Sequence, residues 1–317
     1  MTIQEPTEEA IAAAAAILCT GGLVGMPTET VYGLAADAGN GRAVAAIFAA
    51  KARPQFNPLI VHVTDAEAAS RLGEITGAAE RLASAFWPGP LTLVVRKRLP
   101  SPVAELTTAG LDTVAVRVPS HPVARALLRA VERPIAAPSA NRSGHVSPTT
   151  AAHVAADLGS SVALVLDGGA APIGLESTVL DVTGAHPVVL RLGAITRGDI
   201  ERVIGHPVAV ADGEPDKPRS PGMMARHYAP AARLRIDALD VHEGEALLGF
   251  GPAMPKHAGE AINLSPPGDL AEAAANLFSA LRTLDATGTK SIAVMPIPHL
   301  GLGEAINDRL QRAARTE

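Results

Sequence analysis

The order of apolar and polar positions along the chain predicts short strands that alternate with helices. Residues 113–118 alternate polar and apolar side chains, which is the period of a strand with one buried face. Residues 7–19 are rich in alanine, begin with acidic residues and end at a pair of glycines, which indicates a helix. Further strands are expected at residues 23–26, 91–95, 134–137, 162–166, 178–182, 188–192, 234–236, 246–250 and 291–295. Further helices are expected at residues 40–48, 65–72, 78–86, 122–131, 149–158, 269–284 and 303–314, with a short one beginning near Asp199.

Residues 25–63 carry a dense set of polar side chains at the ends of predicted elements. The pattern indicates a strand, a polar turn, a helix that Asn40 caps and that stops before Pro54, and a second strand. A βαβ unit is therefore predicted. Loops held on a rigid frame are where binding sites are commonly built. The polar residues at these positions are Thr28, Glu29, Thr30, Tyr32, Lys51, Arg53, Asn57 and His62.

Lys51 and Arg53 allow two interpretations. Two cations so close together suit an anionic ligand such as a nucleotide phosphate or a carboxylate. Cations in the last turn of a helix also complement the helix dipole and need no other role. The residue types alone do not decide between these two. We expect both side chains to face solvent when no ligand is bound.

A change of composition divides the chain. Residues 211–221 are rich in Asp, Gly, Glu, Pro, Lys and Arg, which is typical of a linker. We therefore expect a first domain over residues 1–205, a linker over residues 206–232, and a small C-terminal α/β domain over residues 233–317.

The composition sets limits on the class of protein. With 317 residues, of which 47% are hydrophobic and 19% charged, the chain is globular and long enough for two domains. The net charge of -5 argues against non-specific binding of nucleic acid and leaves room for a local cationic pocket. Cys19 is the single cysteine, so it excludes a disulfide framework, and we expect it to pack in the core. The start of the chain is acidic and residues 10–19 are too short to span a bilayer, so we expect a cytoplasmic protein.

Several common chemistries leave no motif in the sequence. There is no phosphate-binding P-loop, no G-x-G-x-x-G after a strand, no Cys/His cluster for zinc and no G-x-S-x-G elbow. What remains is a set of polar residues in predicted loops and strand ends of the first domain. These are Thr30, Lys51, Arg53, Asn57, His62, Thr113, Arg117, Ser139, Asn141, Ser147, Ser177 and Arg191.

Some of these residues have an ordinary structural explanation. Ser139 and Asn141 could make only turn hydrogen bonds, and a histidine in an apolar strand such as His62 is more often a satisfied core residue than a ligand contact. Arg117 and Arg191 are different, because an arginine within a strand must find an anion or bear a desolvation cost.

Six motifs together resemble the YrdC-like threonylcarbamoyl-AMP synthases. They are PTETVYGL at residues 27–34, KARP at 51–54, NPLIVHV at 57–63, VAVRVPSH at 114–121, APSANRSG at 137–144 and ESTVLD at 176–181. RSPGMMARHYAP at residues 219–230, followed by a small α/β domain, resembles the long, two-domain form. The resemblance implies a twisted, open, mostly β sheet with helices around a concave cationic cavity, and a Rossmann-like C-terminal domain.

The resemblance also implies a reaction. ATP, L-threonine and bicarbonate or carbon dioxide would give threonylcarbamoyl-AMP and pyrophosphate, with Mg²⁺ accompanying the nucleotide through its phosphates rather than through a protein metal site. A separate threonylcarbamoyl transferase complex would then modify tRNA. A monomer or dimer without direct DNA binding or membrane attachment is expected.

The resemblance implies a role for particular residues of this sequence. Lys51, Arg53, Ser139 and Asn141 match the polar tetrad that would hold the ATP phosphates and serve catalysis. Further ATP contacts are expected from Asn57, Thr113, Ser147, Arg191, His227 and Tyr228. L-Threonine contacts are expected from Thr30, Tyr32, His62, Arg117, Ala137 and Ser177. Residues 211–228 are the expected lid.

Two other functions remain open from the sequence. One is a non-catalytic RNA-binding module that uses the cationic cavity, against which the acidic balance argues. The other is a related carbamoyl-adenylate transferase, which usually carries acylphosphatase and zinc-finger segments that this sequence does not show.

Overall fold

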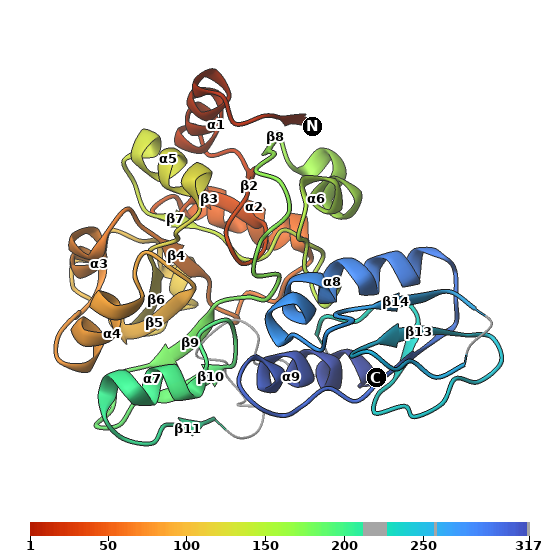
Figure 1. Ribbon diagram of the computed structural model, residues 1–317. Coiled ribbons are helices and arrows are strands. Elements are labelled where there is room, and N and C mark those ends of the chain that lie inside the picture. The colour runs from red at the N-terminus through yellow and green to blue at the C-terminus, as the bar shows by residue number, and fades with distance from the viewer. Residues whose placement is uncertain (212–226, 257–258, 316–317) are drawn as a thin grey trace.

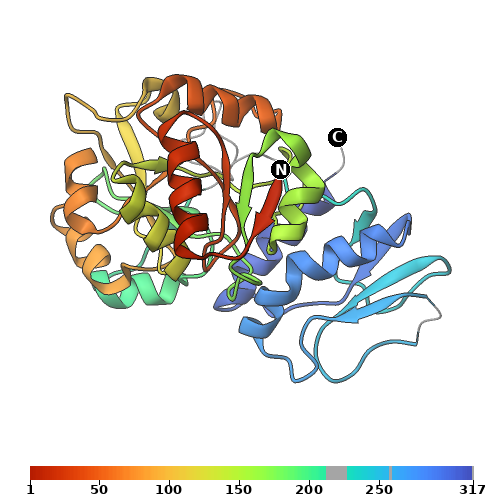
Figure 2. The ribbon, with the colours of Figure 1, turned by 90° about the horizontal axis from the view of Figure 1, so that it is seen from above.

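The chain folds around two sheets that belong to two lobes lying side by side (Figures 1 and 2). The computed structural model describes residues 1–211, 227–256 and 259–315. In this part of the chain the larger sheet has the order β1-β8-β2-β3-β7-β4-β6-β5-β9-β10-β11. The smaller sheet has the order β12-β15-β13-β14, and its neighbouring strands are parallel. The predicted mixed α/β architecture is confirmed.

The strands of the larger sheet are β1 (Thr2–Gln4), β2 (Val24–Met26), β3 (Gly33–Asp37), β4 (Ile60–His62), β5 (Leu91–Arg96), β6 (Thr113–Arg117), β7 (Ile135–Ala136), β8 (Leu164–Leu166), β9 (Thr178–Asp181), β10 (Val188–Arg191) and β11 (Ala209–Val210). Those of the smaller sheet are β12 (Arg233–Arg235), β13 (Glu245–Gly249), β14 (Ala261–Asn263) and β15 (Ser291–Val294). The helices are α1 (Glu8–Cys19), α2 (Gly41–Lys51), α3 (Ala66–Leu72), α4 (Ala78–Phe86), α5 (Pro122–Val131), α6 (Ala151–Leu158), α7 (Arg197–Ile204), α8 (Leu270–Ala286) and α9 (Leu302–Ala314).

The predicted βαβ unit in residues 25–63 contains one strand more than expected. Strand β3 pairs antiparallel with β2, and α2 then leads to β4, with β7 inserted between β3 and β4. The missed strand reads Gly-Leu-Ala-Ala-Asp and is buried throughout. Alanine has a low strand propensity, so local sequence gave no signal and pairing on both sides decided the conformation. Asn40 caps α2 as predicted, since its side chain accepts hydrogen bonds from the amides of Arg42 and Ala43.

Three further strands were not predicted, and one packing expectation was wrong. Strands β1, β11 and β14 have only two or three residues each, which is too short for a periodic pattern. Strand β11 pairs with β10, so the larger sheet extends beyond residue 205. Cys19 is exposed rather than packed in the core, because the buried face of α1 ends at Leu18.

Helices cover both faces of the larger sheet, and a further core joins the two lobes. Helices α1 and α5 pack on one face, whereas α2, α3, α4, α6 and α7 contribute to the core on the other. The core of the smaller lobe includes Val31, Val146 and Leu175, which come from loops of the larger lobe. Those three loops are therefore anchored by apolar burial against the C-terminal lobe.

At Gly193, the chain after β10 closely approaches the loop before β9. A Cβ at Gly193 would lie 2.4 Å from the carbonyl oxygen of Glu176 and 2.5 Å from the amide nitrogen of Thr178. We expect Gly193→Ala to lower the free energy of unfolding by about 1–3 kcal/mol, because backbone atoms must move apart. Chemical denaturation measures this change.

Gly198 provides the matched control. It lies in α7, where an added Cβ would meet only the Thr196 hydroxyl at 4.0 Å. Gly198→Ala should therefore leave stability unchanged or raise it by up to about 1 kcal/mol, as alanine favours helix. Equal losses in both variants would contradict the close approach at Gly193.

Candidate active site

A cavity opens in the larger lobe where loops and strand ends from distant parts of the chain converge. It is lined by Thr28, Thr30, Val31, Gly33, Arg53, Ile60, His62, Arg117, Ala137, Pro138, Ser139, Glu176, Ser177, Arg191 and His227. Its free volume is about 40 Å³, whereas pockets for small-molecule ligands commonly reach about 300–1,000 Å³. A nucleotide therefore requires part of the lining to move.

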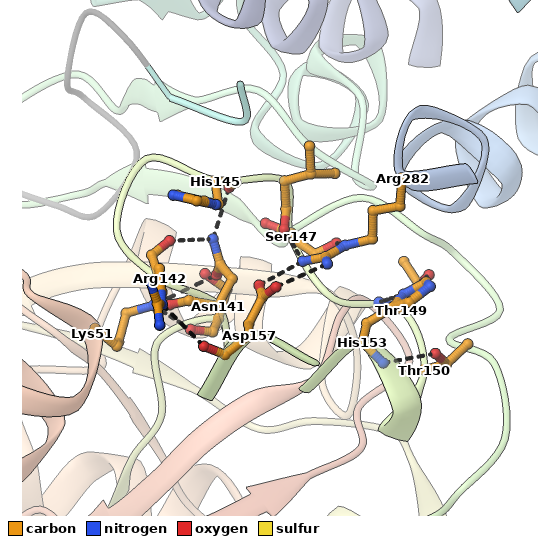
Figure 3. A network of polar contacts seen from close by, with 12 residues as sticks. Lys51, Asn141, Arg142, His145, Ser147, Thr149, Thr150, His153, Asp157 and Arg282 are labelled. Carbon is orange, nitrogen blue, oxygen red and sulfur yellow. Dashed lines mark hydrogen bonds and ion pairs between the residues drawn. The ribbon is translucent and has the colours of Figure 1, made fainter. Parts of the chain in front are cut away.

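Lys51 supports this cavity from behind. Its Nζ donates to the carbonyl oxygen of Ser139 at 2.5 Å. It also donates to the carbonyl oxygen of Asn141 (Figure 3). The side chain is only 1% exposed, so the expectation that it faces solvent was wrong. Although Lys51 is the last residue of α2, these bonds fasten residues 139–141 rather than serve the helix dipole alone.

Arg53 lines the cavity and is also buried, at 8% exposed, which corrects the same expectation for this residue. Its guanidinium donates to the carbonyl oxygens of Asn57 and Pro58, at 3.4 and 3.1 Å. Ala52 between the two cations has a left-handed backbone with φ 49°, which ends the helix and turns the chain. The Asn57 side-chain oxygen is buried without a partner among the described residues.

Arg117 and His62 lie side by side because β4 and β6 pair in parallel with these two residues in register. Arg117 donates to a Glu29 carboxylate oxygen at 2.5 Å, to the Thr30 hydroxyl at 2.9 Å and to the carbonyl of Gly89 at 3.2 Å. The other Glu29 oxygen accepts from the amide of His121 at 3.3 Å. The arginine charge is thus matched inside the protein.

His62 is neutral in the folded state. Burial, with a smaller contribution from the neighbouring Arg117 charge, lowers the pKa of its imidazole to about 3. Its Nδ1 is buried without a hydrogen-bond partner among the described residues. An unpaired polar atom at the cavity wall is free to contact a ligand.

Arg191 reaches the cavity from the end of β10. Its guanidinium donates to the carbonyl oxygen of Ser177 at 2.9 and 3.1 Å and to the Ser177 hydroxyl at 3.0 Å. The same hydroxyl lies 2.8 Å from that of Thr92. Ser177 is therefore held in one orientation.

Three buried cations meet on one side of the site, and no carboxylate among the described residues is in hydrogen-bond contact with them. Burial and the charge of Arg53 hold the pKa of Lys51 well below its usual value. Burial and the charge of Arg191 lower the pKa of Arg53 to about 10. Burial lowers the pKa of Arg191 as well. Bound anionic groups would relieve this repulsion, so the cluster is suited to phosphates.

The remaining predicted residues occupy different positions. Ala137 and His227 line the cavity, whereas Tyr228 is buried beside His227, with ring centroids 4.0 Å apart. The Tyr32 hydroxyl donates to the carbonyl of Gly169 at 2.7 Å, and the ring is not among the lining residues. Thr113 begins β6 opposite Arg96 and also does not line the cavity. Ser147 lies behind the wall, where its hydroxyl donates to Glu176 at 2.5 Å.

Two family models together match most of this chain. A family model described as Sua5_yciO_yrdC, telomere recombination, matches residues 16–193. A second, described as the C-terminal domain of threonylcarbamoyl-AMP synthase, matches residues 195–315. This chain belongs to the Sua5–YciO–YrdC family. The family predicted from the sequence motifs is thereby confirmed.

Individual members of the family match almost the full length. A Pyrococcus abyssi protein named threonylcarbamoyl-AMP synthase is 43% identical, over 99% of this chain and 97% of its own. A Bacillus subtilis protein of the same name is 44% identical, over 96% of this chain and 92% of its own. The crystal structure of P. abyssi Sua5 complexed with L-threonine superposes with a TM-score of 0.90 at 41% identity, covering 99% of this chain and 96% of that one.

Sequence reasoning named Glu29 without giving it a role, and it missed two further charged residues near the cavity, Glu176 and Arg309. Glu29 and Glu176 lie inside the recognised motifs, each beside hydroxyl residues, and their burial next to arginines was the missing information. Arg309 lies far along the chain in α9 and forms an ion pair with Glu176. Nothing in its local pattern distinguishes it from a surface arginine of an amphipathic helix.

The neutral His62 predicts a pH dependence of stability. Its folded pKa of about 3 lies below the ordinary value of 6.5. Between these values the unfolded chain takes up a proton that the folded chain does not, so stability is present above pH 6.5 and decreases on acidification. At about pH 5 the loss should be on the order of 2 kcal/mol from this residue.

The slope of unfolding free energy against pH between 7 and 5 measures this effect. His62→Gln should flatten the slope, whereas His299→Gln, at an exposed position, should not change it. Identical slopes in the wild type and His62→Gln would contradict a neutral, buried imidazole.

Proposed function

We propose that this protein synthesises L-threonylcarbamoyl-AMP from L-threonine, bicarbonate or carbon dioxide and ATP, with release of pyrophosphate. One observation carries the proposal. Among the described residues, no carboxylate is hydrogen-bonded to the buried cations Lys51, Arg53 and Arg191. These cations lie beside a second group in which Arg117, Thr30 and His62 meet. One cavity thus offers a polyphosphate side and an amino-acid side. The names of the relatives support the same reaction.

The nucleotide side consists of the cation cluster and its neighbours. Lys51, Arg53, Ser139 and Asn141 would hold the phosphates and serve as the catalytic group. Lys51 already ties together the two segments that carry these residues. The further proposed ATP contacts are Asn57, Thr113, Ser147, Arg191, His227 and Tyr228. Of these, Arg191 and His227 line the cavity, whereas the other four lie outside its lining.

The amino-acid side lies across the cavity. Arg117 would bind the threonine carboxylate with the Nη hydrogens that its bonds to Thr30 and Glu29 do not use. Thr30, His62 and Ser177 would bind the other polar groups of threonine. Ala137 lines the cavity and would contact the threonine methyl group. Tyr32 would act only by supporting the loop at residues 168–169. A complex of P. abyssi Sua5 with L-threonine supports an amino-acid ligand for this family.

The proposed reaction depends on positioning and charge rather than on a protein nucleophile. The threonine amine adds to carbon dioxide with loss of a proton, or to bicarbonate with loss of water, and gives a carbamate. A carbamate oxygen then attacks the α-phosphorus as pyrophosphate leaves. Lys51, Arg53 and Arg191 would stabilise charge on the phosphoryl oxygens. The described residues contain no cluster of three His, Cys, Asp or Glu side chains that could bind a metal. Mg²⁺ would therefore be held mainly by the ATP phosphates, where it neutralises their charge.

Access to the site would require the linker to move. His227 lines a cavity whose free volume is far smaller than ATP needs, so this residue would shift when ATP binds. Most of the lid predicted at residues 211–228 lies outside the described residues. We propose that residues 211–228 form a lid. We also propose the division into a first domain at residues 1–205, a linker at 206–232 and a C-terminal domain at 233–317.

The wider role follows from the same proposal. The product would pass to a tRNA-modifying threonylcarbamoyl transferase complex, and the protein would act as a nucleotidyltransferase in the cytoplasm, as a monomer or dimer, without binding DNA. No helix in the described residues is long and apolar enough to cross a membrane. The relatives' names favour the synthase over a non-catalytic RNA-binding module and over a related carbamoyl-adenylate transferase.

Selective changes of the two sides test the proposal. With ATP, bicarbonate and L-threonine, Arg53→Gln should raise KM for ATP by roughly tenfold or more and change KM for threonine little. Arg117→Gln should do the reverse, because each arginine would contact a different substrate. Threonine-dependent release of pyrophosphate measures both constants.

Arg81→Gln, on the exposed side of α4, is the control and should retain wild-type constants. A wild-type protein that releases no pyrophosphate in response to threonine would contradict the proposed reaction. Salt-dependent tRNA binding in the absence of ATP would then favour the RNA-binding module.

A further inference from the structure

Arg309 brings a positive charge from the C-terminal lobe against Glu176, a residue that lines the cavity. It lies on α9, and Figure 1 shows this helix beside the segment that carries β9 and β10 of the larger lobe. The side chain is 1% exposed and is the largest fully buried side chain among the described residues. Burying a guanidinium so completely requires partners for its donors.

The partners of Arg309 lie in three separate segments. Its Nε donates to a Glu176 carboxylate oxygen at 2.9 Å, and Nη1 donates to the neighbouring Asp308 at 2.6 Å. Nη2 donates to the carbonyl of Leu192 at 2.7 Å. The guanidinium carbon also lies 4.9 Å from the centre of the Tyr228 ring, a cation–π contact.

Two of these partners, Glu176 and Leu192, adjoin residues of the proposed site. Glu176 lines the cavity, precedes Ser177 in the chain and accepts the Ser147 hydroxyl on its other oxygen. Leu192 directly follows Arg191. One buried guanidinium therefore sets the position of both the carboxylate that orients Ser147 and the strand end that carries Arg191.

The charge of Arg309 also matters at this position. A buried carboxylate in the wall of a cavity for ATP and threonine would repel their anionic groups. The Arg309–Glu176 ion pair compensates that charge and leaves the cations of the cluster to act on the substrate.

A second arginine of the C-terminal lobe supports the same wall. Figure 3 shows Arg282 of α8 paired with Asp157, at 2.7 and 3.1 Å. Its guanidinium also donates to the carbonyl oxygens of Val146 and Ser147. The main chain and the side chain of Ser147 are thus both held, directly or through Glu176, from the C-terminal lobe.

We propose that Arg309 is a positioning residue for the synthesis, through which the C-terminal lobe orders the nucleotide side of the cavity. Glu176 holds Ser147, Leu192 follows Arg191 and Tyr228 contacts Arg309, and all three of these neighbours, Ser147, Arg191 and Tyr228, are proposed ATP contacts. The main effect of Arg309 is therefore expected on ATP binding and turnover. This inference rests on the proposed function.

Kinetics of variants at Arg309 test the inference. Arg309→Met should lower kcat/KM for ATP by roughly 10-fold or more while KM for threonine changes by less than about twofold. Arg309→Lys keeps the charge beside Glu176 and should recover part of the loss. Arg197→Met is the matched control, because it breaks another ion pair between the lobes, the exposed Arg197–Glu304 pair on α7 and α9. This control should retain wild-type constants.

A second variant separates positioning from folding. Arg309→Met leaves the Glu176 charge buried without its partner, and this alone lowers the stability of the variant. The double variant Arg309→Met/Glu176→Gln removes both charges and should fold, as monitored by thermal unfolding, yet keep the raised KM for ATP. Wild-type kcat and KM in the folded double variant, or an equal loss in Arg197→Met, would overturn the inference. If the wild type itself shows no threonine-dependent pyrophosphate release, the proposed function fails, and this inference fails with it.

Discussion

The ammonium group of Lys51 is bound by main-chain carbonyl oxygens rather than by a carboxylate. The positive charge of the site depends on this type of partner. Carbonyl dipoles satisfy the donors of the lysine while they leave its charge uncompensated. The same holds for Arg53 and for Arg191, whose hydrogen bonds go to carbonyl and hydroxyl oxygens. The protein therefore builds a region of positive potential inside a chain whose net charge is -5. A substrate with several negative charges is attracted to this region, whereas the outer surface is not suited to polyanions.

On the other side of the cavity, the buried cation is paired with a carboxylate. Glu29 compensates the charge of Arg117, and Thr30 helps to orient its guanidinium. The guanidinium is therefore held in one orientation, and the pair has little net charge. A guanidinium so arranged can recognise one carboxylate group with defined geometry without attracting a polyphosphate to the same place. This difference in compensation distinguishes the two halves of the site more clearly than the residue types do.

The two lobes form one functional unit in physical terms. Loop residues of the larger lobe take part in the core of the smaller one, and two buried or half-buried arginines of the smaller lobe bind loops next to the cavity. Apolar burial gives the interface its stability, and the ion pairs give it a register, since a buried charge tolerates few alternative positions. The C-terminal lobe thus supports, from behind, residues that line the cavity or lie next to it.

Local sequence patterns alone determined several features of the fold. The bounds of α4 and α5, the cap of α2 by Asn40 and the α/β class follow from short-range periodicity and end signals. The motifs identified the family because they keep their residue types and order. Strand β3 and the burial of Lys51, Arg53, Glu29, Glu176 and Arg309 were decided only by tertiary structure. The physical reason is that an alanine-rich strand and a buried charge are both specified by partners distant in the sequence. No local pattern records which carbonyl, carboxylate or neighbouring strand will satisfy them.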